Sequence, residues 1–584
     1  MTESGVSVRQ TLEMLRSRRE TADIFGAKPD TTFGYPKALG LMWDIALREL
    51  NEQTLKVLQV LCMLHSDCIP QDIFYGHHPE PNLAFLSSIP RTRILAMMSS
   101  LSRRQLISKW QESGRSYLAI HRVLQRCILH RLDAEDGKIQ EIFMVTFALL
   151  RRVFPRQSSI QFPQNDQWNV WEIWSPHIMN LRKVYEESEG EVSASIEFAE
   201  ILGDVANYFW ERNMLSDGIL ASDSAGEICE KLDGQFLHQQ GHIFTLGACI
   251  RLESGISTRS ECFRLMNKAL LLRQCHMNTL VPSEATEIDV QNYANAWSNL
   301  AWALSNYGFY EDAIAYSDFA IAIRNRIGCG SVKINADTLT NKCLCLAALG
   351  IFDEAKKLII TDREIQSWPP EFLKTVYVSL LKFKFYWATI YLQAGDTEKA
   401  YEMINAVLAT CSAYFGPWGS PTLDCYYIMS LVQESRGNIE EAKDLLKMAI
   451  TRPDSWIEEA KLRAQYHLSR MQAATEKTTN SHICVASLRN AKEKLWDQYA
   501  VYVPPDVNLD ESAIYDHMVA LSSGRTSFGK GIPGKTPEMN KVCYFMKSAL
   551  ESALPDGEVF TPREVVRYLK YDGSIPEEQF YYRK

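Results

Sequence analysis

The sequence contains one pattern for phosphate chemistry, Gly529 to Thr536, which satisfies the P-loop spacing G-x-x-x-x-G-K-[ST]. A P-loop holds phosphate when a buried strand precedes it and a helix N-terminus receives the anion. Here residues 521–528 precede it, and they are rich in Ser and Gly without a strand pattern. Pro533 also removes a backbone donor from the loop. We therefore predict a linker in which Thr536 caps a following helix, with no nucleotide or other cofactor bound.

Histidine and cysteine pairs offer a second kind of chemistry. His238 and His242 have the i, i+4 spacing of a zinc-binding helix, but Gln239 stands where such a helix carries its catalytic Glu. Cys343 and Cys345 fall inside a predicted helix, where they fit as small core residues. No Gly-x-Ser-x-Gly elbow is present. We predict no metal site, no catalytic residue and no enzymatic activity.

The elements that position any site are helical repeats, because a Gly-x4-Ala spacing occurs four times. The glycines are 42, 45 and 42 residues apart. Glycine ends a helix at low cost because it adopts positive φ easily, and the acidic residues after it favour the start of the next helix. Alanine lets the two helices pack closely. The four copies are Gly308–Ala313, Gly350–Ala355, Gly395–Ala400 and Gly437–Ala442.

The best copy resembles the tetratricopeptide repeat (TPR), in the longer-period variety found in kinesin light chains. Weaker copies lie at Leu202-Gly203 and Leu246-Gly247, so we expect about six hairpins between residues 190 and 480. The resemblance implies a mostly α fold, with an α-solenoid that forms a right-handed superhelix. The signature positions are occupied by Trp297, Leu300, Ala301, Leu304, Gly308, Ala313 and Ala320.

The same resemblance implies a concave groove lined by the first helix of each repeat. In kinesin-light-chain-like repeats an Asn at the position of Asn299 and Asn341 holds the backbone of an extended peptide, since an amide both donates and accepts. The alternative is that these two residues only bridge adjacent helices, and both interpretations stay open here. The candidate groove residues are Asn295, Ser298, Asn299, Trp302, Ser305, Asn306, Asn341, Lys382, Tyr386 and Gln393.

Residues 36–135 show a different pattern of predicted elements, typical of a winged-helix module. Apolar helical patterns occur near residues 41–50, 54–65 and 91–107. Two short apolar runs then flank the Gly-containing turn 111–116, which predicts a β-hairpin.

This module resembles the winged-helix part of fungal NLR-like STAND proteins, in which it follows an NB-ARC nucleotide-binding domain and precedes TPRs. The similar stretches include "YPKALGLMWDIALREL", "LKVLQVLCMLHSDCIPQDIF" and "YLAIHRVLQRCILHRL". His121 matches the family's Met-His-Asp sensor position, but Arg122 replaces the Asp, so we interpret His121 as vestigial. No room for the nucleotide-binding domain exists upstream of residue 36, so the chain looks like a short paralogue or a truncated gene model.

Composition narrows the function classes. The net charge is −9 and the pI about 5.8, which argues against a general nucleic-acid binder. Scattered cysteines and the absence of a long apolar stretch argue for a cytoplasmic or nuclear protein without a membrane span. The module at 36–135 carries twelve Lys or Arg and nine Asp or Glu, a net +3, so DNA binding there is the runner-up.

We therefore predict a non-enzymatic scaffold that binds a protein or peptide in a TPR groove, resembling the sensor arm of a STAND protein. A winged-helix DNA-associated regulator and an accessory adaptor in metabolism or transport are the alternatives. The oligomeric state is left open. The expected organisation is an N-terminal helical segment (1–35), the winged-helix-like module (36–135), linking helices (136–190), TPR-like repeats (191–500) and a linker with short C-terminal helices (501–584).

Overall fold

The computed structural model describes residues 39–571 except 77–78, 189, 233–235, 452–455, 476–487, 496–509, 527–537 and 555–557. The chain forms two compact units. The front unit comprises residues up to 156 together with 167–205, and the repeat unit comprises 157–166 together with 206 onwards. The N-terminal segment 1–35 and the P-loop-like pattern 529–536 lie outside the described residues.

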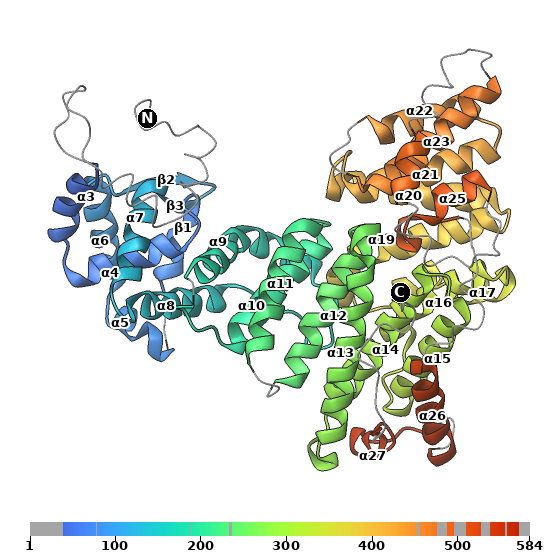
Figure 1. The fold of residues 1–584 in the computed structure, drawn as a ribbon, viewed down its shortest axis with the longest axis horizontal. Coiled ribbons are helices and arrows are strands. Elements are labelled where there is room, and N and C mark those ends of the chain that lie inside the picture. Colours follow the sequence, from blue (N-terminus) through green and yellow to red (C-terminus); the bar gives the residue numbers. More distant parts are fainter. Residues whose placement is uncertain are drawn as a thin grey trace. The chain divides into compact units, whose positions relative to one another are not determined.

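The front unit combines helices with a small antiparallel sheet of order β1-β3-β2 (Figure 1). The predicted hairpin is confirmed: Ile107 pairs with Ile120 and Glu112 with Arg115, so the strands are longer and the turn tighter than expected. The elements are α3 (Leu39–Arg48), α4 (Glu52–Met63), β1 (Ile69–Pro70), α5 (Ala84–Ser87), α6 (Arg91–Arg103), β2 (Ile107–Glu112), β3 (Arg115–Ile120), α7 (Arg122–Ala134), α8 (Lys138–Val153) and α9 (Trp168–Glu187).

Two side chains from other helices satisfy the carbonyls at the C-terminal end of α4. Gln125 of α7 donates to the carbonyls of Cys62 and Leu64 at 2.8 and 2.7 Å. Asn180 of α9 donates to Met63 and Leu64 at 2.9 and 3.0 Å. Helix ends leave such carbonyls without partners in the helix, so these amides fix α7 and α9 against α4.

The repeat unit is a TPR-type α-solenoid, in which most helices pack against the next along the chain and α16 also packs against α19. The boundary between the units falls inside α10 (Ile196–Glu211). The helices that follow are α11 (Leu215–Lys231), α12 (Leu237–Glu253), α13 (Arg259–Thr279), α14 (Glu287–Asn306), α15 (Tyr310–Arg326), α16 (Val332–Ala348), α17 (Phe352–Leu358), α18 (Asp362–Gln366), α19 (Pro370–Gln393), α20 (Thr397–Phe415), α21 (Ser420–Ser435), α22 (Ile439–Ile450) and α23 (Glu458–Thr475).

The predicted glycine helix ends are confirmed in all four copies. Gly308, Gly350, Gly395 and Gly437 have φ between +77° and +85°. In each, the N–H after the glycine bonds back to a carbonyl five residues earlier, as in Phe309 to Leu304 at 3.2 Å, which completes a Schellman motif. The alanines five residues after the glycines are buried. The repeats therefore turn through one conserved backbone geometry.

The C-terminal segments pack onto the repeats. Helices α26 (Glu538–Ala553) and α27 (Pro562–Val566) contact α15 and α14, as Figure 1 shows in red. The Gly- and Ser-rich composition of residues 521–536 predicts a linker, and this prediction is wrong for the described part, 521–526. Leu521 lies in the 3-10 turn η9 (Leu521–Ser523), and both it and Arg525 are buried. The linker prediction failed here because this part of the segment is held by distant partners, described below.

Candidate peptide-binding pocket

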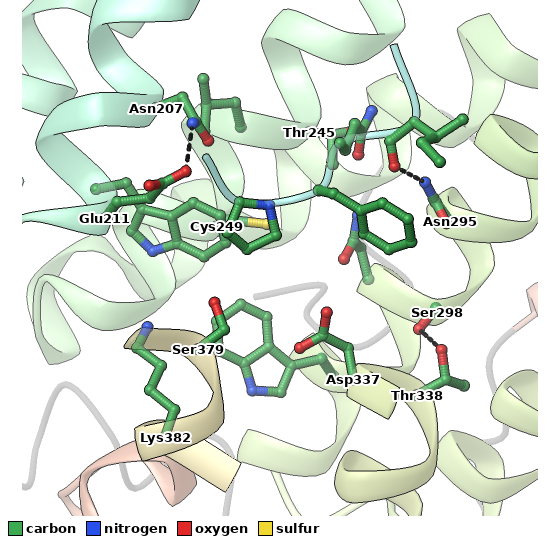
Figure 2. Close-up of a pocket in the computed structure, with 18 of the residues that line it drawn as sticks. Asn207, Glu211, Thr245, Cys249, Asn295, Ser298, Asp337, Thr338, Ser379 and Lys382 are labelled. Atoms are coloured by element: carbon green, nitrogen blue, oxygen red, sulfur yellow. Dashed lines mark hydrogen bonds between the residues drawn. The ribbon is translucent and has the colours of Figure 1, made fainter. Parts of the chain in front are cut away.

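A pocket in the repeat unit is formed by α10, α12, α14, α16 and α19 together with residues 157–166 (Figure 2). We call residues 157–166 the strap. The pocket has a volume of about 1250 Å³, including the part open to solvent. Its polar lining residues include Asn207, Glu211, His242, Glu253, Asn295, Ser298, Asn299, Arg324, Asp337, Thr338, Asn341, Ser379 and Lys382.

Asparagine side chains hold the strap by its backbone. On α14, Asn292 donates to the carbonyl of Ser159 at 2.8 Å, and Asn295 donates to the carbonyl of Ile160 at 3.1 Å. From α19, the backbone N–H of Val378 donates to the side chain of Asn165 at 2.9 Å. The α14 face therefore already binds irregular backbone in the way expected of the groove, with a segment of the same chain as the ligand.

Glu211 and His242 hold the strap from α10 and α12. The Glu211 carboxylate accepts the N–H of Gln164 at 3.2 Å and the amide of Asn165 at 2.9 Å. The His242 ring lies between two glutamines of the strap, with Nε2 2.6 Å from Oε1 of Gln157 and Nδ1 2.6 Å from Nε2 of Gln161. A neutral ring satisfies both contacts, because Nε2–H donates while Nδ1 accepts.

Burial lowers the pKa of His242 to about 3, with the nearby Arg273 and His238 acting in the same direction. An unfolded His titrates near 6.5, so between pH 6.5 and 3 the unfolded chain binds a proton that the folded chain does not. The neutral His242 therefore contributes its full stability above pH 6.5 and loses it as the pH falls. We expect a loss of about 1.4 kcal/mol per pH unit below 6.5 from this group.

Urea unfolding at pH 7.0, 5.5 and 4.5 of the wild type and His242→Gln tests this expectation. The variant should lose stability less steeply on acidification, because glutamine does not titrate. Parallel pH profiles for the two proteins would contradict it.

A buried arginine orients the asparagine that holds Ile160. From α15, the two terminal nitrogens of Arg324 donate to Oδ1 of Asn295 at 2.7 Å, Oδ1 of Asn335 at 2.8 Å and Oγ1 of Thr338 at 3.0 Å. Burial lowers the pKa of Arg324 to about 10, which still leaves it charged at neutral pH. Because Arg324 holds Oδ1 of Asn295, the amide nitrogen of Asn295 is turned toward the strap.

Asn299 on α14, and Asp337 and Asn341 on α16, are among the polar side chains of the pocket that have no hydrogen bond in the described part of the chain. Asp337 is exposed, and Figure 2 shows its carboxylate facing the open space across from Asn207 and Thr245. The surrounding protein raises the pKa of Asp337 by desolvation, while Lys382 and Arg324 oppose that shift. These groups are available to a ligand.

Lys382 is engaged with the opposite wall. Its ammonium lies 2.8 Å from Glu253 and 5.3 Å from the ring centre of Trp210. The Trp210 indole donates to the same carboxylate at 3.1 Å, and its ring lies 6.5 Å from that of Trp302. Glu253 therefore neutralises Lys382 within the pocket.

Seven of the ten predicted groove residues line this pocket: Asn295, Ser298, Asn299, Trp302, Asn341, Lys382 and Tyr386. The other three, Ser305, Asn306 and Gln393, do not line it. Asn306 and Gln393 instead bind the backbone of the segment 521–526. Asn306 accepts the N–H of Leu521 at 2.7 Å, and Gln393 reaches the carbonyl of Arg525 at 3.4 Å. Ser305 is buried and donates to the carbonyl of Trp302 in its own helix.

The sequence analysis missed Glu211, Arg324, Asp337 and the strap as parts of the site. Asp337 lies four residues before Asn341 on the same helix, and that spacing places both on one face. Helical spacing from Asn341 could therefore have found this position. Arg324 and Glu211 act across helices and leave no local signal.

The predicted positions in the front unit make contacts within that unit. His121 is exposed and precedes α7, where its Nδ1 accepts the N–H of Val123 at 3.3 Å as an N-cap. Two arginines on or beside α6, which could contact DNA in a winged-helix module, have partners within the front unit: Arg91 lies 4.5 Å from the ring centre of Tyr75, and Arg104 pairs with Glu49.

His238, His276 and Asp289 cluster closely enough to resemble a metal site. However, Nδ1 of His238 lies 3.1 Å from the guanidinium of Arg273, which places a second positive charge where an ion would bind. His276 lies 2.9 Å from Asp289. Burial alone raises the pKa of Asp289, but hydrogen bonds from His276 and Thr286 bring it below the usual range. We assign the cluster to a polar network that joins α12, α13 and α14.

Comparison with known proteins finds one family model and a set of solved structures that are similar to the chain. A family model described as a domain of unknown function (DUF7779) matches residues 45–137. A crystal structure of a Rap protein complexed with competence and sporulation factor has 16% sequence identity and a TM-score of 0.28, covering 64% of this chain and 92% of that chain. None of the curated proteins matches. Neither match names the NLR-like STAND proteins.

Among the described helices, none combines the length and apolar character needed to cross a membrane.

Proposed function

We propose that the chain is a non-enzymatic scaffold that binds an extended segment of a partner protein in the pocket of the repeat unit. One observation supports this most strongly: Asn292 and Asn295 already bind the carbonyls of the strap. Asn299, one turn further along the same helix, and Asn341 on α16 offer the same amide chemistry without a partner among the described residues. A peptide backbone matches such amides because both donate and accept.

We further propose that the protein works as the sensor arm of an NLR-like STAND system, in the cytoplasm. The support is the sequence resemblance of residues 36–135 and the order of that module before TPR-type repeats. The cysteines agree with a reducing compartment, because the described ones are free thiols and most are buried.

A pull-down from a lysate of the source organism tests the pocket. Tagged full-length protein is compared with Asn299→Ala/Asn341→Ala and with Asn405→Ala, an exposed asparagine on α20. We expect the wild type and the control to retain the same proteins and the double variant to lose them, with helical content and Tm unchanged. An identical set from all three would contradict the proposed use of the pocket.

A further inference from the structure

The charged groups of the pocket, taken one by one, leave a single carboxylate without a partner among the described residues. Glu211 accepts hydrogen bonds from the strap, and Glu253 is bound to Lys382 and Trp210. The two terminal nitrogens of Arg324 donate to Asn295, Asn335 and Thr338. Within the described residues Asp337 has neither a hydrogen bond nor an ion pair, although it faces the open part of the pocket.

A carboxylate in such a place favours a cationic ligand. The surrounding protein partly desolvates Asp337, so its charge is less well stabilised than on an open surface. A ligand ammonium or guanidinium restores that stabilisation, and charged hydrogen bonds of this kind are the stronger ones. The charge of the neighbouring Lys382 lowers the pKa of Asp337, but its ammonium is bound to Glu253 at 2.8 Å and forms no ion pair with Asp337.

The geometry of α16 links this charge to backbone recognition. Asn341 follows Asp337 by four residues, about 6 Å along the helix axis. An extended chain advances about 3.3 Å per residue, so the two side chains match positions about two residues apart in a ligand. Apolar residues of the strap and of the helices also line the pocket, among them Ile160, Phe162, Val378 and Phe383.

We propose that the pocket binds an extended partner segment that carries a Lys or Arg, whose cation pairs with Asp337 while Asn341 and Asn299 hold the adjacent backbone. This rests on the peptide-binding function proposed above and specifies its ligand class. Because side chains of an extended segment alternate in direction, an apolar residue next to the basic one faces the strap.

Selection from a displayed library of random twelve-residue peptides against the full-length protein tests the ligand class. The wild type should enrich peptides with Lys or Arg at one fixed position. A resynthesised peptide should bind Asp337→Asn about tenfold or more weakly, and Asp353→Asn, an exposed Asp on α17, as the wild type does. Asp337→Lys should select Asp or Glu at the same position. Unchanged thermal unfolding of Asp337→Asn shows that the fold is kept.

The outcomes separate the two proposals. Peptides without a basic position, bound equally by the wild type and Asp337→Asn, would overturn the ligand class but leave peptide binding intact. The absence of any enriched peptide would refute both. Enrichment only after removal of residues 572–584 would identify the chain's own basic tail, Arg583-Lys584, as the occupant and overturn a partner segment. Affinity that falls with added salt for the wild type but not for Asp337→Asn supports the ion pair.

Discussion

Replacing Arg463 by methionine should destabilise the repeat unit by about 3–5 kcal/mol, because it leaves a buried charge without its partner. Arg463 on α23 lies 2.8 Å from Asp516 on α25 (Glu511–His517), and both side chains are buried. Arg463 also donates to the carbonyls of Gly524 and Ser523 at 3.0 and 2.9 Å. The arginine thus ties the C-terminal segment 510–526 to the last repeat.

Urea unfolding against a matched surface variant measures this effect. Arg470 lies on α23 like Arg463, and it forms an exposed ion pair with Glu434 on α21. Arg470→Met removes this pair and should lower the free energy of unfolding by less than about 1 kcal/mol. The double variant Arg463→Met/Asp516→Leu should be more stable than either single variant, since no charge then stays unpaired. Arg463→Met as stable as Arg470→Met would refute the role assigned to this pair.

The second large effect should come from Arg324→Met, which we expect to cost about 2–4 kcal/mol. Its three acceptors are partly or fully buried, and Asn335 and Thr338 lose a partner that water does not easily replace. Asn295 also loses the contact that orients it toward Ile160. The variant should therefore loosen the strap as well as lower overall stability.

Hydrogen exchange distinguishes these two consequences. Amides of residues 157–166 should exchange faster in Arg324→Met than in Arg363→Met, an exposed control on α18, under conditions where both proteins stay folded. Equal exchange of the strap in the two variants would show that Asn295 holds its orientation without Arg324. Urea unfolding of the same pair gives the stability difference.

The solenoid could be predicted from the sequence because its signals are local. A helix end needs a residue that adopts positive φ, and a glycine supplies it in each copy: Gly308, Gly350, Gly395 and Gly437. Close packing of the two helices needs a small buried residue, which is the alanine five residues later. The asparagine face of α14 was predicted from the resemblance to TPR repeats, which the same local signals carry. A contact that repeats at a fixed spacing is visible in one sequence.

The strap and the C-terminal segment could not be predicted in this way. Residues 157–166 contain Pro163 and several polar residues, which indicates irregular backbone but not a binding partner. Their contacts reach residues up to 213 positions away, as between Asn165 and Val378. The same holds for Asn306 with Leu521, so a position expected in the groove proved to hold another part of the chain.

The chain passes between the two units three times, at 156/157, 166/167 and 205/206. This connectivity restricts how the gene can recombine. An exchange of everything after residue 205 would carry the repeats into a new protein without their own strap, and His242, Glu211 and Asn295 would then face a foreign loop. To keep the pocket intact, a transfer of the repeats must also include the ten residues 157–166, which lie in the sequence between the two segments of the front unit.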